Sequence, residues 1–310
     1  MTTSSAPGKI ILFGEHAVVY GRPALAVPVT QVQATATVSE NSRGGVWVEA
    51  PNINLSSELS HLVDGHPLAA VINSVFSSLH VVRPPACTVY IQSTIPVAAG
   101  LGSGAAVSVA ILRALSAFLG QPLPDEQVNQ LAFEAEKIHH GMPSGIDNTV
   151  VTYARPVYFV KGQPIKPFRL GAPFTIVIGD TGISALTKES VGALRSLREE
   201  NPPRWEKVFD RVGKIVWDAR QAIERGDIAE LGTLMDANHA LLQEMTVSSP
   251  ELDHLTETAR KFGALGAKLS GGGRGGNMIA LVHKEKAPAV AEALLSAGAK
   301  RTIVTTIQLK

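Results

Sequence analysis

The spacing of hydrophobic positions divides the first part of the chain into strands and helices. Residues 10–13 form a short apolar run, and residues 31–39 alternate Val, Ala and Thr with polar side chains, so both predict strands. Residues 67–79 have helical spacing, and residues 87–91 return to the pattern of a strand. Residues 105–119 are apolar on nearly every face, which predicts a helix buried on all sides at the centre of a domain.

Helical spacing prevails beyond about residue 49. Residues 125–140 place apolar side chains on one helical face and acidic side chains in the first turn, where the helix dipole favours them. A strand is expected at 175–178, followed by two or three polar amphipathic helices over 188–242. Strand and helix then alternate as far as a last strand at 303–309, and this mixed order predicts an α+β fold.

The chain is long enough for two domains of ordinary size, because it has 310 residues and only 18% of them are charged. The apolar run 157–160 and the Pro-rich stretch 163–173 indicate a hinge. We therefore expect an N-terminal domain over 1–165, which carries the nucleotide and catalytic motifs, and a C-terminal domain over 166–310.

Charge and cysteine content limit the possible partners. Lys and Arg number 28 against 27 Asp and Glu, so no strong overall field attracts nucleic acid or an anionic membrane, and a small molecule is the expected partner. The single cysteine, Cys87, lies in a strand-like run and is expected to be a buried thiol, as suits a reducing cytoplasm. Residues 1–7 lack the features of a signal peptide, and the uncharged stretch 84–112 is too broken by Pro and Gly to span a membrane.

The first segment with candidate chemistry is the glycine-rich stretch 96–106, which follows a strand and opens the apolar helix. Its glycines allow close approach to an anion, and free N–H groups and the helix dipole favour phosphate at a helix start. Taken alone, the pattern is equally typical of a tight strand-to-helix turn. It fits neither the Walker pattern nor the dinucleotide fingerprint, because no Lys-Ser or Lys-Thr pair ends the loop and Gly100, Gly102 and Gly104 are two residues apart.

The second segment runs from Glu136 to Asp147. Glu136 lies one helical turn beyond Ala132, beside the apolar stripe, so we expect a partly desolvated carboxylate that favours a cation such as Mg²⁺. The alternative for Glu136 is an ordinary surface carboxylate. His139 and His140 are candidate metal ligands, but adjacent residues point to different helix faces and no Cys or His cluster accompanies them, which favours packing or capping.

Asp147 follows a Pro-Ser-Gly turn at 143–145, which fixes its direction. A carboxylate held in this way suits a base acting on a hydroxyl group. The alternative, helix capping, is the more common role for a single Asp in such a position.

The third segment, 268–277, places five glycines between two strand-like runs. Such backbone freedom is costly on folding and usually persists in functional loops, so close contact with a ligand is expected. The alternatives are a flexible hairpin and, for Arg274, either a solvated tip or a phosphate contact.

Together with residues 6–21, these segments resemble, in order and spacing, the signature motifs of the superfamily that contains galactokinase, homoserine kinase and mevalonate kinase. The resemblance extends over essentially the whole chain, and residues 6–21 and 140–148 are most similar to the mevalonate kinases. It implies a two-domain small-metabolite kinase fold, with an N-terminal ribosomal-protein-S5-like domain and a C-terminal ferredoxin-like α/β sandwich. It also implies ATP and Mg²⁺ as cofactors, phosphorylation of the 5-hydroxyl of mevalonate in isoprenoid synthesis, and a homodimer.

The resemblance also implies roles for individual residues. Asp147 corresponds to the catalytic aspartate, Lys9 to the lysine paired with it, and Glu136 to the Mg²⁺ carboxylate. The expected ATP-binding residues are Pro96, Ala98, Ala99, Gly100, Leu101, Gly102, Ser103, Gly104 and Ala105. The expected substrate-binding residues are Lys9, Glu15, His16, Ser144, Gly145, Asp147, Ser270 and Gly271.

Two departures from the family pattern accompany these assignments. Gly104 stands where the family commonly has a second serine at the Mg²⁺ site, which leaves Ser103 or water to take that place. Arg274 and Asn277 replace residues that are more often Gly and Cys.

Three alternatives to the mevalonate assignment stay open on the sequence alone. One is phosphomevalonate kinase or another small-alcohol kinase of the superfamily. Another is a non-catalytic sensor of ATP and a metabolite, favoured by Gly104 but opposed by the presence of Lys9, Glu136 and Asp147. The third, a nucleotide-binding oxidoreductase, is disfavoured by the failed dinucleotide fingerprint.

Overall fold

The computed structural model describes residues 1–63, 65–96, 100–140, 144–164, 168–184 and 187–308, without the side chains of 139, 140, 187 and 188. Ala98 and Ala99 of the predicted ATP loop, and the side chains of His139 and His140, therefore lie outside the described residues. The chain divides into a first unit, Met1–Lys9, Val32–Val97 and Leu101–Arg155, and a second unit, Ile10–Gln31, Ala98–Gly100 and Pro156–Lys310. The predicted domain boundary after residue 165 falls outside the described residues and stays a prediction.

The first sheet has the strand order β1-β2-β5-β3-β4, and β6 also pairs with β2. Strands β2 and β5 are antiparallel, β5 and β3 are parallel, and β3 and β4 form an antiparallel hairpin. The strands are β1 (Thr2–Phe13), β2 (Ala24–Glu40), β3 (Val46–Ala50), β4 (Leu55–Glu58), β5 (Cys87–Ser93) and β6 (Val157–Phe159). The alternation at 31–39 and the strand at 87–91 are confirmed, and the Cys87 thiol is fully buried.

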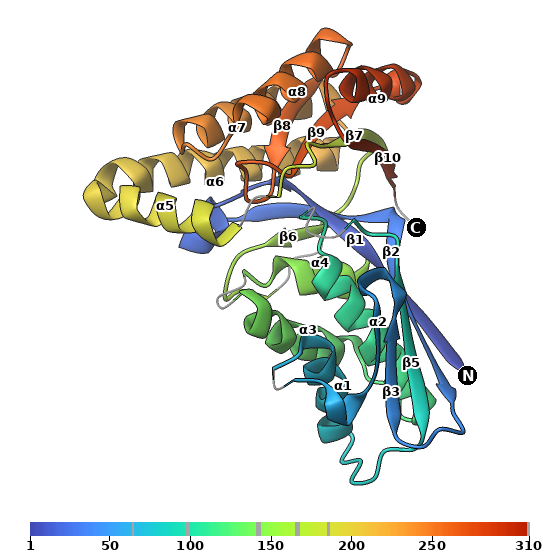
Figure 1. Cartoon of the computed structure of the whole chain (residues 1–310). Helices are drawn as coiled ribbons and strands as arrows, with labels where there is room; N and C mark the ends of the chain where they lie inside the picture. The colour runs from blue at the N-terminus through green and yellow to red at the C-terminus, as the bar shows by residue number, and fades with distance from the viewer. Residues whose placement is uncertain (64, 97–99, 141–143, 165–167, 185–186, 309–310) are drawn as a thin grey trace. The chain divides into compact units, whose positions relative to one another are not determined.

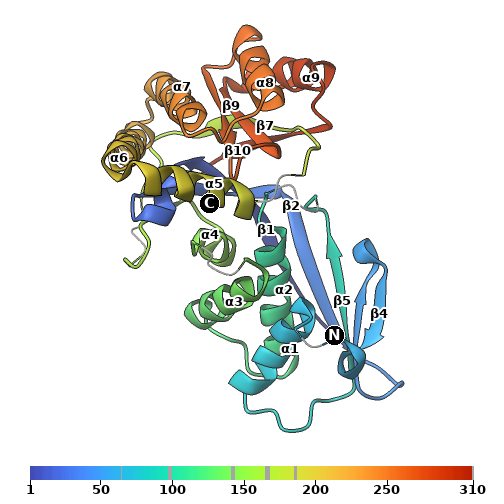
Figure 2. The same cartoon turned by 60° about the vertical axis from the view of Figure 1, so that its left-hand side comes forward.

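Helices of the first unit lie on one side of strands β2 and β5, as Figures 1 and 2 show. They are α1 (Pro67–Ser78), α2 (Ser103–Phe118), α3 (Asp125–His140) and α4 (Ile146–Tyr153). Helix α2 contacts α1, α3, α4 and β5, which explains why the sequence of α2 is apolar on nearly every face. The central buried helix is therefore confirmed, although it begins at Ser103.

The second unit contains an antiparallel sheet with the order β10-β7-β9-β8. Its strands are β7 (Phe174–Asp180), β8 (Gly266–Ser270), β9 (Asn277–Val282) and β10 (Arg301–Ile307). Helices α7 and α8 pack on β8, α9 packs on β7 and β10, and α6 joins α5 to α7 (Figure 1). These helices are α5 (Thr187–Glu200), α6 (Pro202–Arg225), α7 (Ile228–Glu244), α8 (Pro250–Lys261) and α9 (Ala287–Ser296).

Short 3₁₀ helices complete the description: η1 (Ala17–Tyr20), η2 (Pro51–Ile53), η3 (Leu59–His61) and η4 (Lys284–Lys286). Segregated helices and largely antiparallel sheets confirm the predicted α+β class. The short strand β4 was not predicted, because the sequence Leu-Ser-Ser-Glu has little apolar alternation. A membrane-crossing helix is absent from the described part of the chain, where none combines sufficient length with sufficient apolar character.

An aromatic and ionic contact fixes η1 to α6 within the second unit. The rings of Tyr20 and Phe209 stack with centroids 4.4 Å apart. Arg22 pairs with Glu206 at 2.6 Å and with Asp210 at 2.8 Å. The turn that precedes η1, which carries Glu15 and His16, is therefore anchored to the helical layer.

Candidate active site

Lys9 and Asp147, both in the first unit, form an ion pair. The Lys9 Nζ lies 2.8 Å from Asp147 Oδ1, and the side chain of Lys9 is 6% exposed whereas that of Asp147 is 29% exposed. Asp147 occupies the first turn of α4, after Gly145 in a left-handed conformation with φ of 91°. The Ser144 hydroxyl accepts a hydrogen bond from the Ile146 N–H, so the turn at 144–146 directs the Asp147 carboxylate. The carboxylate is thus both paired and accessible to a reacting hydroxyl.

The glycine-rich loop packs directly against this ion pair. The backbone N–H of Lys9 donates to the Leu101 carbonyl at 2.9 Å. Gly102 has φ of 72°, and a Cβ there would lie 2.8 Å from Lys9 Cγ and 3.6 Å from Asp147 Oδ2. Only glycine fits this position without displacing the charged pair.

Helix α2 begins at Ser103, directly after Gly102, and among the described residues no side chain caps its first N–H groups. Free N–H groups and the helix dipole favour an anion at this point. A Cβ at Gly104 would meet no described atom within 4 Å, so the missing family serine would fit here. Pro96 and Gly100 flank residues 97–99 in the sequence, and among the described residues no contact gives Pro96 a specific part in the loop.

Glu136 is buried in α3, at 6% exposure, which confirms the desolvation expected from its place beside the apolar stripe. Burial raises the pKa of Glu136 to about 8, the Asp147 carboxylate adds to this rise, and the Lys9 ammonium opposes it. The charges of Lys9 and Asp147 therefore both act on the Glu136 carboxyl group within the first unit. A cation beside this buried carboxyl group would stabilise its ionised form.

In the second unit, Glu15 forms an ion pair with Lys268 of β8, and both side chains are fully buried. Lys268 Nζ also donates to the Leu269 carbonyl at 2.6 Å. Burial lowers the pKa of Lys268, and Glu15 opposes this shift. The segment 268–277 contains Lys268, but the pairing of Lys268 with Glu15 was not predicted. The available signal is a lysine within a short, fully buried strand.

His16 follows Glu15 and has the left-handed φ of 61°, which is unusual for a residue other than glycine. Its Nε2–H donates to the Gly272 carbonyl at 3.1 Å, and its Nδ1 has no hydrogen-bond partner among the described residues. Burial lowers the pKa of His16 to about 4, and Arg274 and Lys268 contribute to the decrease while the Gly272 carbonyl opposes it. The ring is therefore neutral at physiological pH, with Nδ1 as its acceptor.

The third segment is the hairpin loop between β8 and β9, in which Ser270 lies opposite Asn277, and its backbone is hydrogen-bonded to neighbouring segments. The Gly276 carbonyl accepts from the Thr181 N–H and hydroxyl at 2.9 and 3.0 Å, and the Arg274 N–H donates to the Val247 carbonyl at 2.8 Å. Gly275 has φ of 136°, and a Cβ there would lie 2.7 Å from the Ile183 carbonyl oxygen. The glycines therefore allow close backbone packing as well as left-handed conformations.

The environment differs between the individual residues of this loop, as Ser270, Gly271 and Arg274 show. The Ser270 hydroxyl donates to the Ile11 carbonyl at 2.7 Å, which ties β8 to the end of β1. Gly271 has φ of 89° and space on its Cβ side, whereas Arg274 is exposed. The loop thus joins the buried Lys268–Glu15 pair to the His16 contact within the second unit.

Comparison with known proteins agrees with this arrangement. The profile of the GHMP kinases N terminal domain matches residues 68–155, and that of the GHMP kinases C terminal matches residues 219–300. The chain belongs to the GHMP kinase family, and it is therefore an enzyme, a kinase that uses ATP.

Within that family the chain is similar to mevalonate kinases. It is 39% identical to the mevalonate kinase of Thermococcus gammatolerans and 38% identical to that of Thermococcus onnurineus, with 95% of this chain and 93% of each relative covered. The crystal structure of L. major mevalonate kinase in complex with R-mevalonate superposes with a TM-score of 0.86 at 31% identity, covering 99% of this chain and 96% of that one.

Proposed function

We propose that this chain transfers the terminal phosphoryl group of ATP to the 5-hydroxyl of mevalonate, giving 5-phosphomevalonate and ADP. The observation that carries the proposal is the Lys9–Asp147 ion pair at 2.8 Å, packed against Gly102 of the glycine-rich loop. The mevalonate kinases among the relatives support the choice of acceptor.

Phosphoryl transfer requires positioning and charge stabilisation more than covalent help from the protein. In the proposed reaction, Asp147 accepts the hydroxyl proton as the oxygen forms its bond to the terminal phosphorus and the bond to ADP breaks. Lys9 pairs with the Asp147 carboxylate and stabilises negative charge that develops on the transferred group. The N–H groups at the start of α2, together with residues 100–105, are proposed to hold the ATP phosphates.

For the acceptor, we propose contacts with Glu15, His16, Ser144, Gly145, Ser270 and Gly271. A neutral His16 accepts a hydrogen bond through Nδ1, the ring atom that has no partner among the described residues. Glu15 is held in one position by its buried pairing with Lys268, which favours a substrate contact of fixed geometry.

We also propose that Glu136 and Ser103 hold Mg²⁺. The raised pKa of Glu136 reflects a buried carboxylate whose ionised form a cation would stabilise, and the Ser103 hydroxyl opens α2 beside the proposed phosphate site. A magnesium ion there would neutralise charge on the ATP phosphates.

Replacing Glu136 with Gln is expected to raise the Mg²⁺ concentration for half-maximal rate by about tenfold, the factor equivalent to about 1.4 kcal/mol of binding. The reason is that Gln keeps the size of the side chain but removes the negative charge that attracts the cation. Rates measured at fixed ATP over a range of Mg²⁺ concentrations test this. Glu134→Gln, on an exposed position of the same helix, is the matched control, and equal Mg²⁺ dependence in the two variants would contradict the assignment.

The substrate assignment is tested by coupled ADP release with mevalonate, phosphomevalonate, homoserine and galactose at saturating ATP. We expect turnover with mevalonate alone. Turnover with phosphomevalonate alone would indicate the neighbouring kinase class, and ATP binding without turnover of any of the four would favour a non-catalytic sensor.

We also propose an assembly state and a cellular location for the protein. A homodimer is proposed from the family resemblance, and light scattering on the purified chain tests it. A cytoplasmic location is proposed because a single buried thiol, Cys87, suits a reducing compartment.

A further inference from the structure

Strand β8 lies at the end of the strand order in its sheet, next to β9. No other strand pairs with it in the part of the chain that the structure describes. All five residues of β8 are nevertheless buried. Because buried backbone polar groups must be hydrogen-bonded, the free edge of β8 needs partners other than a strand.

Side chains from α7 and α8 form hydrogen bonds with the backbone N–H and carbonyl of Ala267. Its N–H donates to Asp236 Oδ1 at 2.9 Å, and its carbonyl accepts from Arg260 Nη2 at 2.7 Å. Asp236 and Arg260 are also paired with each other at 2.6 Å. Two helices are thus joined to one residue of the strand.

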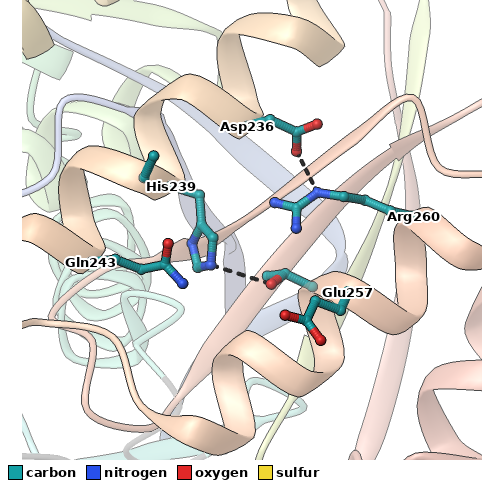
Figure 3. Close-up of a pocket in the computed structure, with 7 residues that line it drawn as sticks. Asp236, His239, Gln243, Glu257 and Arg260 are labelled. Atoms are coloured by element: carbon teal, nitrogen blue, oxygen red, sulfur yellow. Dashed lines mark hydrogen bonds and ion pairs between the residues drawn. The ribbon is translucent and has the colours of Figure 1, made fainter.

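Leu269 lies two residues further along β8, so its backbone N–H and carbonyl point to the same free edge as those of Ala267. Side chains form hydrogen bonds with both of these groups as well. Its N–H donates to His239 Nδ1 at 3.3 Å, and its carbonyl accepts from Lys268 Nζ. His239 and Asp236 are three residues apart on α7 and lie on one face of that helix. Figure 3 shows both of them at the pocket of about 280 Å³ that α7 and α8 line, with Arg260 on the opposite side.

The protonation of His239 follows from these contacts. Since Nδ1 accepts a hydrogen bond, the ring proton lies on Nε2, which is 3.1 Å from Asp253 Oδ1 and 3.2 Å from Thr256 Oγ1. Burial lowers the pKa of His239 to about 4; Lys268 and Arg260 contribute to the decrease, and Asp253 opposes it. The imidazole is therefore a neutral acceptor for β8 at physiological pH.

Strand β8 and the loop after it contact the residues that we propose to bind the acceptor substrate. Lys268 pairs with Glu15, Ser270 donates to the Ile11 carbonyl, and the loop that follows β8 supplies the Gly272 carbonyl to His16. Strand β8 and the loop that follows it therefore supply contacts to both Glu15 and His16, in addition to the contacts that hold η1 on α6. Among the described side chains, His239 is the acceptor nearest to that loop on the free edge of β8.

We propose that His239 is a positioning residue for the acceptor substrate: through the Leu269 N–H it holds β8 where Lys268, Ser270 and the following loop place Glu15 and His16. This inference rests on the proposed function.

The test uses two substitutions of His239, and each of them keeps a polar group near one of the two ring nitrogens. His239→Asn retains an acceptor near the place of Nδ1, and His239→Gln retains a polar group near the place of Nε2. We expect the Gln variant to raise KM for mevalonate roughly 5- to 10-fold, the factor that corresponds to the net loss of one hydrogen bond. The Asn variant should stay within about twofold of wild type, and KM for ATP should be unchanged in both. Glu257→Gln, an exposed residue of the same pocket, is the matched control.

A merely structural role would lower the active fraction, and with it kcat, without a selective change in KM for mevalonate. That outcome, or equal KM values for the Asn and Gln variants, would overturn the proposal. If the Gln variant does not fold by circular dichroism, exchange of the Leu269 amide in wild type and in His239→Asn decides: similar protection in both supports the proposal, and unprotected exchange in wild type overturns it. A wild-type enzyme that does not turn over mevalonate would instead disprove the proposed function.

Discussion

Replacing Asp147 with Asn is expected to lower kcat by about 10³-fold while KM for ATP changes less than about threefold. A positioned base contributes on the order of 10²- to 10⁴-fold to proton transfer, and Asn has nearly the same shape but cannot accept the proton. ATP binding is expected to persist, because the start of α2 and residues 100–105 are unchanged. Single-turnover kinetics with mevalonate, combined with equilibrium binding of ATP, measure the two effects separately.

The pairing with Lys9 complicates this experiment, because the substitution leaves the Lys9 ammonium, 6% exposed, without its carboxylate. Thermal unfolding of the variant must therefore accompany the kinetics. Asp125→Asn in the same unit also removes an ion pair, the exposed one with Arg113, and should leave kcat unchanged. A rate for Asp147→Asn equal to that of the Asp125 variant would refute the assignment of Asp147 as the base.

Replacing Lys268 with Met is expected to destabilise the protein by about 3 kcal/mol. Removing one partner of a buried ion pair leaves the other charge in a poorly solvated site, which typically costs about 3–5 kcal/mol. Both side chains of this pair have no exposed surface, so solvent cannot compensate the loss. Urea unfolding followed by circular dichroism measures the change.

Two further variants separate this effect from a general effect of the substitution. Lys214→Met removes an exposed ion pair with Asp218 and is expected to change stability by less than about 0.5 kcal/mol. The double replacement Lys268→Met with Glu15→Leu should recover most of the lost stability, because an apolar pair can replace a buried ionic one at little cost. If Lys268→Met is no less stable than Lys214→Met, the buried pair does not have the importance inferred here.

Much of the fold could be predicted from local patterns. The all-round apolar sequence of α2, the alternation of β2 and the one-sided stripe of α3 each express the surface that the element buries. The same stripe placed Glu136 in a desolvated position, and its burial is confirmed. The glycine spacing at 100–104 marked the start of α2 as a place where backbone approaches another group closely.

The hydrogen-bond and ion-pair partners of the site residues could not be predicted from local sequence patterns. Lys268 and Glu15 are 253 residues apart, and His16 and Gly272 are 256 residues apart. The pairing of Lys9 with Asp147 was expected only from the family resemblance. The side chains that seal β8 also escaped prediction, because nothing in a single strand's sequence shows which of its edges lacks a neighbour.

The sequence by itself determined the α+β class, most of the secondary structure, the three glycine-rich or acidic segments and the family, because these depend on the order and spacing of residues along the chain. Tertiary structure alone decided that Lys268 and Glu15 form a fully buried ion pair, and that Lys9 is buried while its partner Asp147 stays partly exposed. It also decided that His16 and His239 stay neutral. The physical reason is that desolvation and ion pairing depend on distances in space, and residues far apart in the chain become neighbours only when the sheets and helices close around them.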